Sequence, residues 1–122
     1  MNLADFLYSF SSGSLEIKEG GYITQQLHGD MELLRKYLNL ELKQLEAYRI
    51  IVPNGKFVPE HMHYLGIEYF IPIDKLNAEI EGKKIETQSP FKVGRGVRHG
   101  FPGSQLFYAI KEYDHEFDKV FF

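Results

Sequence analysis

From Leu45 onward the sequence is a succession of short β-forming segments separated by turn-forming residues. Residues 48–52 are rich in β-branched side chains and end at Pro53-Asn54-Gly55, a strong turn signal. Further β-forming segments lie at residues 67–73 and 106–111, and Gly82 separates residues 78–81 from 83–87 as in a hairpin. Short strands with turns about every 8 to 12 residues predict an all-β sandwich or barrel.

The first 44 residues have a different pattern. Apolar residues at helical spacing in residues 3–10 predict a short docking helix, followed by an exit loop at residues 11–14. Asp30 is a good N-cap for a second helix reaching Leu38, with an edge strand at residues 31–38 as the alternative. We therefore predict one domain, in which residues 1–44 pack as a helical or extended segment on a barrel formed by residues 45–122.

Composition excludes several classes of function. The chain has 122 residues, 43% of them hydrophobic, which suffices for one packed core. A net charge of −3 without a Lys/Arg cluster argues against nucleic-acid binding. No apolar run is long enough to span a membrane, and the N-terminus lacks the features of a signal peptide, so we predict a cytoplasmic protein. Without cysteine, any metal site must use nitrogen and oxygen ligands.

Three polar residues in the β region have the spacing of metal ligands. His61 and His63 are two residues apart, so on a strand both imidazoles project from the same face. Glu68 follows five residues after His63, an odd offset that would place it on the opposite face of one continuous strand. It can join the histidines only if the chain turns between them, and Tyr64-Leu65-Gly66 is the predicted turn.

A fourth candidate ligand, His99, lies in a glycine-dense segment, residues 94–103, that would bring another strand close to the others. Three imidazoles and one carboxylate suit a divalent ion of Fe, Mn, Ni, Co, Cu or Zn. Such a set leaves one or two coordination positions for water or substrate. An ordinary surface His-x-His pair is the alternative. His28 and His115 have no comparable surroundings in the sequence.

Both segments resemble the conserved motifs of the cupins. Gly55-x5-His61-x-His63-x4-Glu68 is similar to the first cupin motif, and the stretch from Gly94 to His99 is similar to the second. The sequence departs from the usual pattern at Lys75, Gly94 and Gly103, which are turn or strand-end positions. The resemblance implies a double-stranded β-helix, or jelly-roll barrel, that binds one metal ion per chain through His61, His63, Glu68 and His99. Some cupin-like proteins keep this arrangement without binding metal.

Strand alternation selects candidate residues for a substrate pocket beside the metal. By parity, Phe57 shares the face of His61, Phe70 that of Glu68, and Arg95, Val97 and Phe101 that of His99. The apolar residues could equally fill the barrel. Arg95 could hold a substrate carboxylate or phosphate at the barrel mouth, or be a solvated strand-end residue. The sequence does not identify any catalytic residues.

The segment 67–73 is apolar on its other face as well, through Ile67, Tyr69, Ile71 and Ile73. A strand that is apolar on both faces is covered on both sides. The cover could be a second sheet, the N-terminal helix or another subunit. Because many cupins dimerise through such surfaces, we predict a homodimer.

Three functions remain compatible with these features. The first is a metal-dependent enzyme, of oxygenase or isomerase/epimerase type, acting on a small polar molecule. The second is a non-catalytic small-molecule-binding or sensing module. The third is a structural or interaction protein. We favour the first, but fold alone does not fix function.

Overall fold

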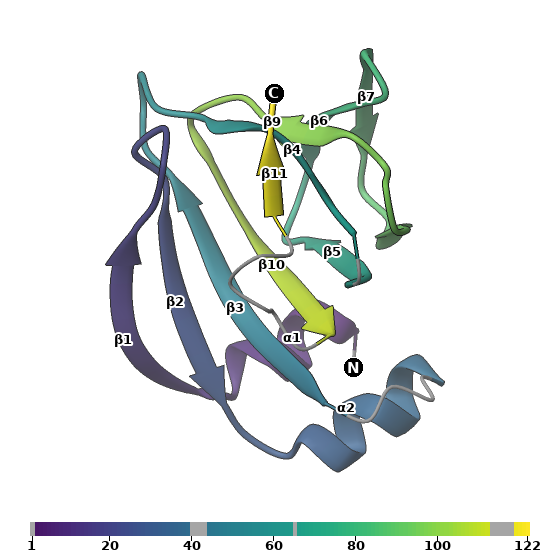
Figure 1. Ribbon diagram of the computed structural model, residues 1–122. Coiled ribbons are helices and arrows are strands. Elements are labelled where there is room, and N and C mark those ends of the chain that lie inside the picture. The colour runs from purple at the N-terminus through teal and green to yellow at the C-terminus, as the bar shows by residue number, and fades with distance from the viewer. Residues whose placement is uncertain (1, 40–43, 65, 113–118) are drawn as a thin grey trace.

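The computed structural model describes residues 2–39, 44–64, 66–112 and 119–122, and these form two short helices and eleven strands (Figure 1). In chain order the elements are α1 (Leu3–Tyr8), β1 (Ser11–Ile17), β2 (Ile23–His28), α2 (Met31–Leu38), β3 (Leu45–Val52), β4 (Val58–His63), β5 (Glu68–Pro72), β6 (Leu76–Ile80), β7 (Lys83–Thr87), β8 (Phe91–Val93), β9 (His99–Phe101), β10 (Gln105–Glu112) and β11 (Lys119–Phe121).

The strands form two antiparallel sheets. The larger sheet has the order β1-β2-β3-β10-β5-β8, and the smaller sheet has the order β11-β4-β9-β6-β7. Consecutive strands such as β4 and β5 lie in different sheets, so the chain crosses from one sheet to the other between them. The predicted all-β class with short N-terminal helices is confirmed.

Both helices begin at polar N-cap residues, of which Asp30 was predicted. The Asn2 side chain accepts a hydrogen bond from the backbone N–H of Asp5, and Asp30 caps α2 in the same way. Helix α2 ends at Asn39, whose left-handed φ of 53° stops the helix. The helical interpretation of residues 31–38 is thus correct, and the edge-strand alternative is wrong.

The helices cover the outer face of the larger sheet. Leu3, Phe6 and Leu7 of α1 and Leu34 of α2 pack in one buried cluster with outward-facing residues of the sheet, among them Ile71 of β5. The second apolar face of β5 is therefore covered by this chain's own N-terminal segment. The homodimer stays a prediction.

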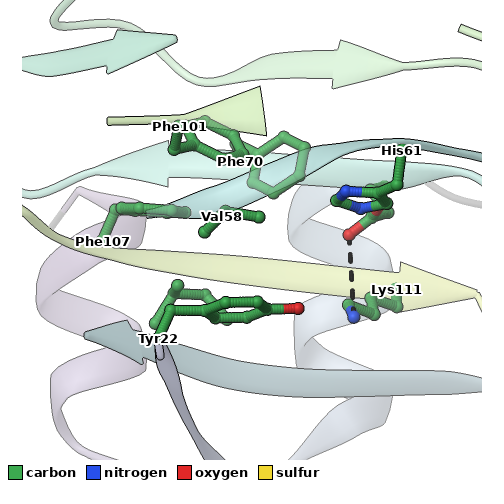
Figure 2. Close-up of a pocket in the computed structure, with 9 residues that line it drawn as sticks. Tyr22, Val58, His61, Phe70, Phe101, Phe107 and Lys111 are labelled. Carbon is green, nitrogen blue, oxygen red and sulfur yellow. Dashed lines mark ion pairs between the residues drawn. The ribbon is translucent and has the colours of Figure 1, made fainter. Parts of the chain in front are cut away.

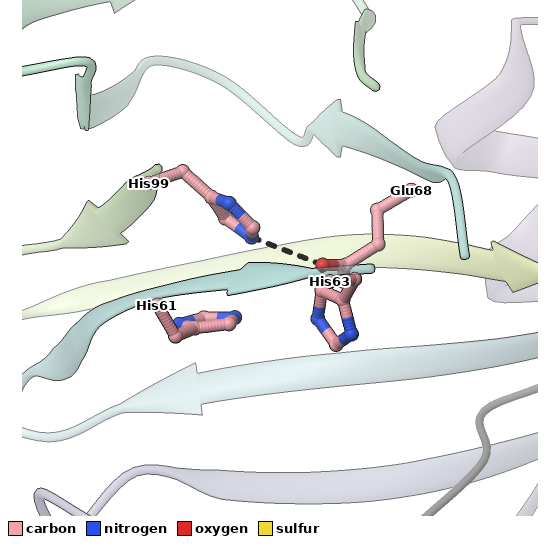
Figure 3. A group of neighbouring side chains, drawn as sticks. All are labelled: His61, His63, Glu68 and His99. Atoms are coloured by element: carbon pink, nitrogen blue, oxygen red, sulfur yellow. Dashed lines mark hydrogen bonds and ion pairs between the residues drawn. The ribbon is translucent and has the colours of Figure 1, made fainter. Parts of the chain in front are cut away.

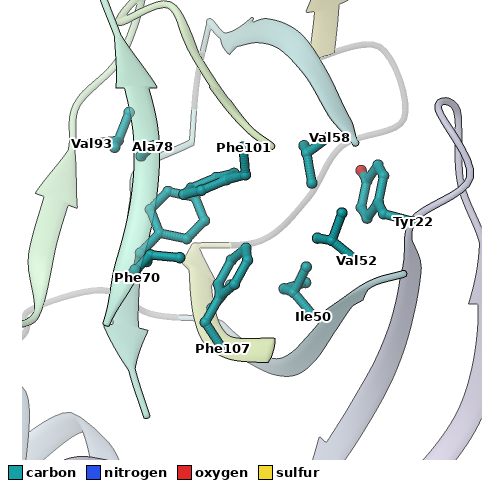
Figure 4. Packing of buried hydrophobic residues seen from close by; sticks show 11 residues of the cluster. Tyr22, Ile50, Val52, Val58, Phe70, Ala78, Val93, Phe101 and Phe107 are labelled. Carbon is teal, nitrogen blue, oxygen red and sulfur yellow. The ribbon is translucent and has the colours of Figure 1, made fainter. Parts of the chain in front are cut away.

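A second buried cluster fills the space between the two sheets (Figure 4). Strand β10 shows the alternation that separates the two clusters, since Phe107 and Ala109 face inward while Tyr108 and Ile110 face the helices. The inner cluster combines aromatic and β-branched side chains, for instance Phe70, Phe101 and Val52. This core supports one wall of the site described below.

The predicted loop at residues 11–14 is wrong. Ser11 already pairs with His28, and β1 runs to Ile17 with an irregularity in its register between Ser12 and Leu15. A Cβ at Gly13 would come within 2.9 Å of the Gln26 backbone carbonyl oxygen on the neighbouring strand, which explains a glycine within this strand. Strands β1 and β2 thus join the same sheet as β3, and the proposed division at residue 44 stays a prediction.

Gly100 permits the close approach of β9 to β4. A Cβ at this position would come within 2.9 Å of the Val58 carbonyl oxygen. We expect Gly100→Ala to lower the free energy of unfolding by about 1–3 kcal/mol, because strands must separate to accommodate the methyl group. Gly94→Ala is the control, since the nearest atom to its Cβ is 3.9 Å away. Urea denaturation of both variants measures this, and equal losses would contradict the packing argument.

The described part of the chain contains no helix that is long and apolar enough to cross a membrane.

Candidate metal centre

The structure brings together all four predicted ligands, from three strands and both sheets (Figure 3). His61 and His63 lie on β4, and His99 lies on the neighbouring strand β9, where it is the register partner of His61. Glu68 begins β5 in the opposite sheet and points toward the three rings. All four side chains are buried. The predicted turn between His63 and Glu68 includes Leu65, which lies outside the described residues.

A bulge in β4 places the histidines. The register between β4 and β9 shifts between Val58 and His61, so these two residues both face inward although they are three positions apart. Simple alternation would place Phe57 on the face of His61, but the bulge breaks that relation. Phe57 lies instead at the surface, with about half of its area exposed.

The donor atoms of the four residues converge closely. One ligand atom from each side chain lies within 4.8 Å of all the others. Oε1 of Glu68 is 2.7 Å from Nε2 of His63 and 3.0 Å from Nε2 of His99. Donors bound to a first-row metal ion lie about 2.0–2.2 Å from it, which places neighbouring donors roughly 3 Å apart. The cluster therefore has dimensions close to those of a metal site.

Backbone carbonyl groups fix two of the rings. Nδ1–H of His61 donates to the Pro59 carbonyl oxygen at 2.7 Å, and Nδ1–H of His99 donates to that of Val97 at 2.9 Å. Because a carbonyl oxygen only accepts, the proton must lie on Nδ1, which leaves Nε2 as the inward donor atom. Metal-binding histidines are commonly oriented by such a second hydrogen bond.

Burial and charge set the protonation of the cluster. Burial, with the neighbouring His99 and Lys119, lowers the pKa of His61 to about 3, so this ring is neutral at pH 7. Burial alone would raise the pKa of Glu68, but the charge of Lys111 and the close contacts with the imidazoles of His63 and His99 hold it well below its usual range. A neutral imidazole and an ionised carboxylate are the forms that bind a metal ion.

These shifts predict that the metal-free protein loses stability in mild acid. Between the ordinary histidine pKa of 6.5 and about 3, the unfolded chain binds a proton at His61 that the folded chain excludes. The free energy of unfolding should therefore fall as the pH drops below 6.5, by up to about 1.4 kcal/mol per pH unit. Glu68 acts in the same direction below pH 4.5.

Urea denaturation in chelator between pH 7 and pH 4.5 measures this dependence. His61→Gln should have a shallower slope, whereas His28→Gln, at an exposed position, should keep the wild-type slope. The same slope in His61→Gln and in the wild type would show that another group is responsible.

The residues fit a divalent metal ion. Two imidazole nitrogens lie within 3.0 Å of one carboxylate oxygen, and such contacts between acceptor atoms need either a shared proton or a cation. On His99 the Nδ1 proton is already used by Val97. An ion bound by all four donors would satisfy them together, and three nitrogens with one oxygen suit the first-row metals. The cluster could thus hold a metal ion, whose identity the residues leave open.

A small pocket adjoins the cluster (Figure 2). Of the five predicted pocket residues, Phe70 and Phe101 line it, and the Phe70 ring lies 5.6 Å from that of His99. Val97 packs against the inner core. Phe57 and Arg95 are not among the described lining residues. Arg95 lies in the turn before β9, where strand alternation does not apply, and it is exposed.

Sequence reasoning missed three polar residues around the pocket. Lys111 and Tyr22 line it, and Nζ of Lys119 donates to the Tyr22 hydroxyl at 2.7 Å. For Lys111 a signal was present, because it shares the parity of Phe107 on β10 and so faces the interior. Tyr22 precedes β2, and its position depends on long-range pairing that the sequence does not reveal.

Comparisons of the sequence with protein-family models found no match, and neither did comparison with curated proteins. Solved structures do match. A cupin-like protein from Thermotoga maritima superposes with a TM-score of 0.63 at 15% identity, covering 93% of this chain and 87% of that one. The nucleoside dehydratase Pac13 of Streptomyces gives 0.65 at 12% identity, covering 94% and 90%. KdgF from Halomonas sp. gives 0.60 at 14%, covering 84% and 88%. At these identities the likeness concerns the fold.

Proposed function

Starting from the cupin fold, which these likenesses confirm for this chain, we propose that the protein is a metal-dependent enzyme acting on a small polar molecule. His61, His63, Glu68 and His99 would hold one divalent ion, and the adjoining pocket would receive the substrate. Oxygenase and isomerase/epimerase reactions are both compatible with this arrangement. Pac13, which shares the fold, has been solved with uridine, which supports small-molecule binding in a barrel of this kind.

The convergence of four buried donors carries the proposal. A buried carboxylate with three imidazoles is costly unless its charge is compensated, and nothing in an ordinary core requires this combination. The carbonyl groups of Pro59 and Val97 hold two rings with Nε2 directed inward. When bound, a divalent ion would supply Lewis-acid or oxygen-activating chemistry. The residues of the chain orient the donors, and the phenyl rings of Phe70 and Phe101 exclude water from one side.

Elemental analysis of protein purified without chelator or affinity metal tests the metal site. We expect about one divalent ion per wild-type chain and almost none in His61→Ala, because that change removes a ligand whose Nε2 faces the centre. His28→Ala is the matched control, since His28 is exposed on β2. Equal metal contents in the two variants, or a metal-free wild type that also fails to take up added ions, would refute the proposed site.

A non-catalytic module that binds a small molecule is the second candidate. The cavity has a volume of about 20 Å³, room for about one water molecule, so a larger substrate requires side chains to move. Incubating the metal-loaded protein with candidate substrates distinguishes the two. Recovery of a bound compound unchanged after long incubation would favour the binding module, and turnover that requires the metal would favour the enzyme.

A further inference from the structure

A groove lies on the outer face of the larger sheet, between α1 and the strands β1, β3 and β10. The candidate metal ligands, by contrast, converge between the two sheets. The groove has a volume of about 630 Å³, which is in the range of sites that hold small organic molecules. It is therefore a candidate binding site separate from the metal centre.

Much of the groove is lined by apolar and aromatic side chains that the fold leaves uncovered. Tyr8 of α1 is 76% exposed, and Leu106 of β10 and Ile73, which follows β5, are about half exposed. Phe10 and the ring of Tyr108, both buried, complete this part of the lining. Apolar groups gathered at the surface in this way are typical of a site for an apolar ligand or partner.

Arg49 of β3 provides the groove with unused hydrogen-bond donors. Its Nη1 donates to the side-chain oxygen of Gln25 at 2.6 Å and to the hydroxyl of Ser12 at 3.3 Å, and both acceptors are neutral. A guanidinium group has five N–H donors, of which these contacts use two. Its Nε and Nη2 make no hydrogen bond or ion pair with any described residue. These two atoms form an edge that can bind a carboxylate through two parallel hydrogen bonds.

Tyr108, the neighbour of Arg49 across the sheet, adds a second unused polar group. The two residues are register partners on β10 and β3, and the guanidinium carbon lies 5.7 Å from the centre of the tyrosine ring. Only 2% of Tyr108 is exposed, yet its hydroxyl makes no hydrogen bond with any described residue. Because the polar groups of buried residues usually have a partner, this hydroxyl is available to a ligand in the groove.

We propose that the groove binds a small monocarboxylate with an apolar, aromatic body. Arg49 binds the carboxylate through Nε and Nη2, the Tyr108 hydroxyl donates to the same group, and the exposed apolar side chains contact the body. Asp5 is exposed and also lines the groove, so it repels a second negative charge and favours a monoanion over a phosphate ester. This site lies outside the proposed metal-dependent activity and does not depend on it.

Metal-free protein, kept in chelator, tests the groove without interference from a metal ion. The probe is 3-phenylpropionate, and 3-phenylpropanamide is its neutral counterpart of nearly the same size. We expect the carboxylate to bind with a dissociation constant of about 1 mM or lower, and the neutral compound at least tenfold more weakly. In NMR spectra the carboxylate should shift the backbone N–H signals around Arg49 and Tyr108, and the size of the shifts against concentration gives the affinity.

Three variants test the two polar groups. Arg49→Met should weaken 3-phenylpropionate binding at least tenfold and leave 3-phenylpropanamide binding unchanged, because a charge-assisted contact is lost. Arg98→Met is the matched control, since this exposed arginine contacts Glu60 on the smaller sheet and should not affect binding. Tyr108→Phe should weaken binding about fivefold and keep the wild-type stability in urea, because the hydroxyl has no partner among the described residues.

The results that would overturn the proposal are distinct. They are a wild type that does not bind the probe, unchanged binding in Arg49→Met, unchanged binding in Tyr108→Phe, or equal losses in Arg49→Met and Arg98→Met. If Arg49→Met does not fold, Arg49→Gln keeps a donor toward β1 and β2, and the same criteria apply.

A second copy of the chain is the competing occupant of the groove, and sedimentation tests it. A wild type that sediments as a dimer, and that Leu106→Glu converts to a monomer, would assign the groove to a subunit interface and overturn the proposal. A wild type that stays monomeric at the concentrations of the binding experiment would support it. Neither result bears on the metal site, because all these measurements are made without metal.

Discussion

A saturating divalent ion should raise the melting temperature of the wild-type protein by roughly 10–20 °C and leave that of His99→Ala almost unchanged. An ion present at a thousand times its dissociation constant stabilises the folded state by about 4.1 kcal/mol, provided that it does not bind the unfolded chain. In a domain of this size each kcal/mol corresponds to about 3–5 °C. His99 is fully buried, and its Nε2 points into the cluster.

Thermal denaturation of each variant with and without metal checks this result. The comparison within one variant removes the destabilisation that the alanine itself causes by leaving a cavity. His28→Ala, which changes an exposed histidine, should show the wild-type shift. A shift of the same size in His99→Ala would mean that the ion binds elsewhere.

Without metal, replacing Glu68 by leucine should lower the free energy of unfolding by about 3–5 kcal/mol. The change leaves the buried ammonium group of Lys111 without the carboxylate opposite it, and breaking one side of a buried ion pair has a cost of this order. Adding Lys111→Met should restore most of the loss, because two apolar side chains can then pack across β5 and β10. The double variant should bind no metal.

Urea denaturation in chelator gives the four free energies of this double-mutant cycle. The expected coupling stabilises the native pair of Glu68 and Lys111 by at least about 2 kcal/mol, because the double variant recovers most of the loss seen in Glu68→Leu. A double variant no more stable than Glu68→Leu would show that the carboxylate is needed for the histidines and not for the lysine.

Much of the fold was predictable because its signals are local. The turn at Pro53-Asn54-Gly55 ends β3, and the β6–β7 hairpin turns at Gly82, whose φ is +77°. Asp30 begins α2 as predicted. The loop prediction at residues 11–14 was wrong because the relevant signal is not local. Ser and Gly form an edge strand only when a partner such as β2 is present.

In the candidate site, too, the residues with local sequence signals were predicted and those that depend on strand pairing were missed. The four ligands were predicted from spacing and from a resemblance to known motifs, and the structure brings them together. Phe57 was misplaced because a bulge between Val58 and His61 has no signature in the sequence. Strand parity on β10 indicated that Lys111 faces the interior, but not that it lies beside Glu68, because Glu68 is 43 positions earlier in the chain and the register of β10 against β5 follows from the assembled sheet.

The distribution of the ligands over two sheets has a consequence for folding kinetics. His61 and His99 come together when β4 pairs with β9, but Glu68 reaches them only once the larger sheet has closed over the smaller one. If the transition state for folding precedes that closure, it has no complete ion-binding set. A bound ion would then leave the refolding rate unchanged. It would slow unfolding by nearly the same factor by which it raises the folding equilibrium constant. The ion would therefore stabilise the native state kinetically, by slowing its unfolding. Stopped-flow measurements of folding and unfolding rates against denaturant concentration, with and without metal, can detect this effect.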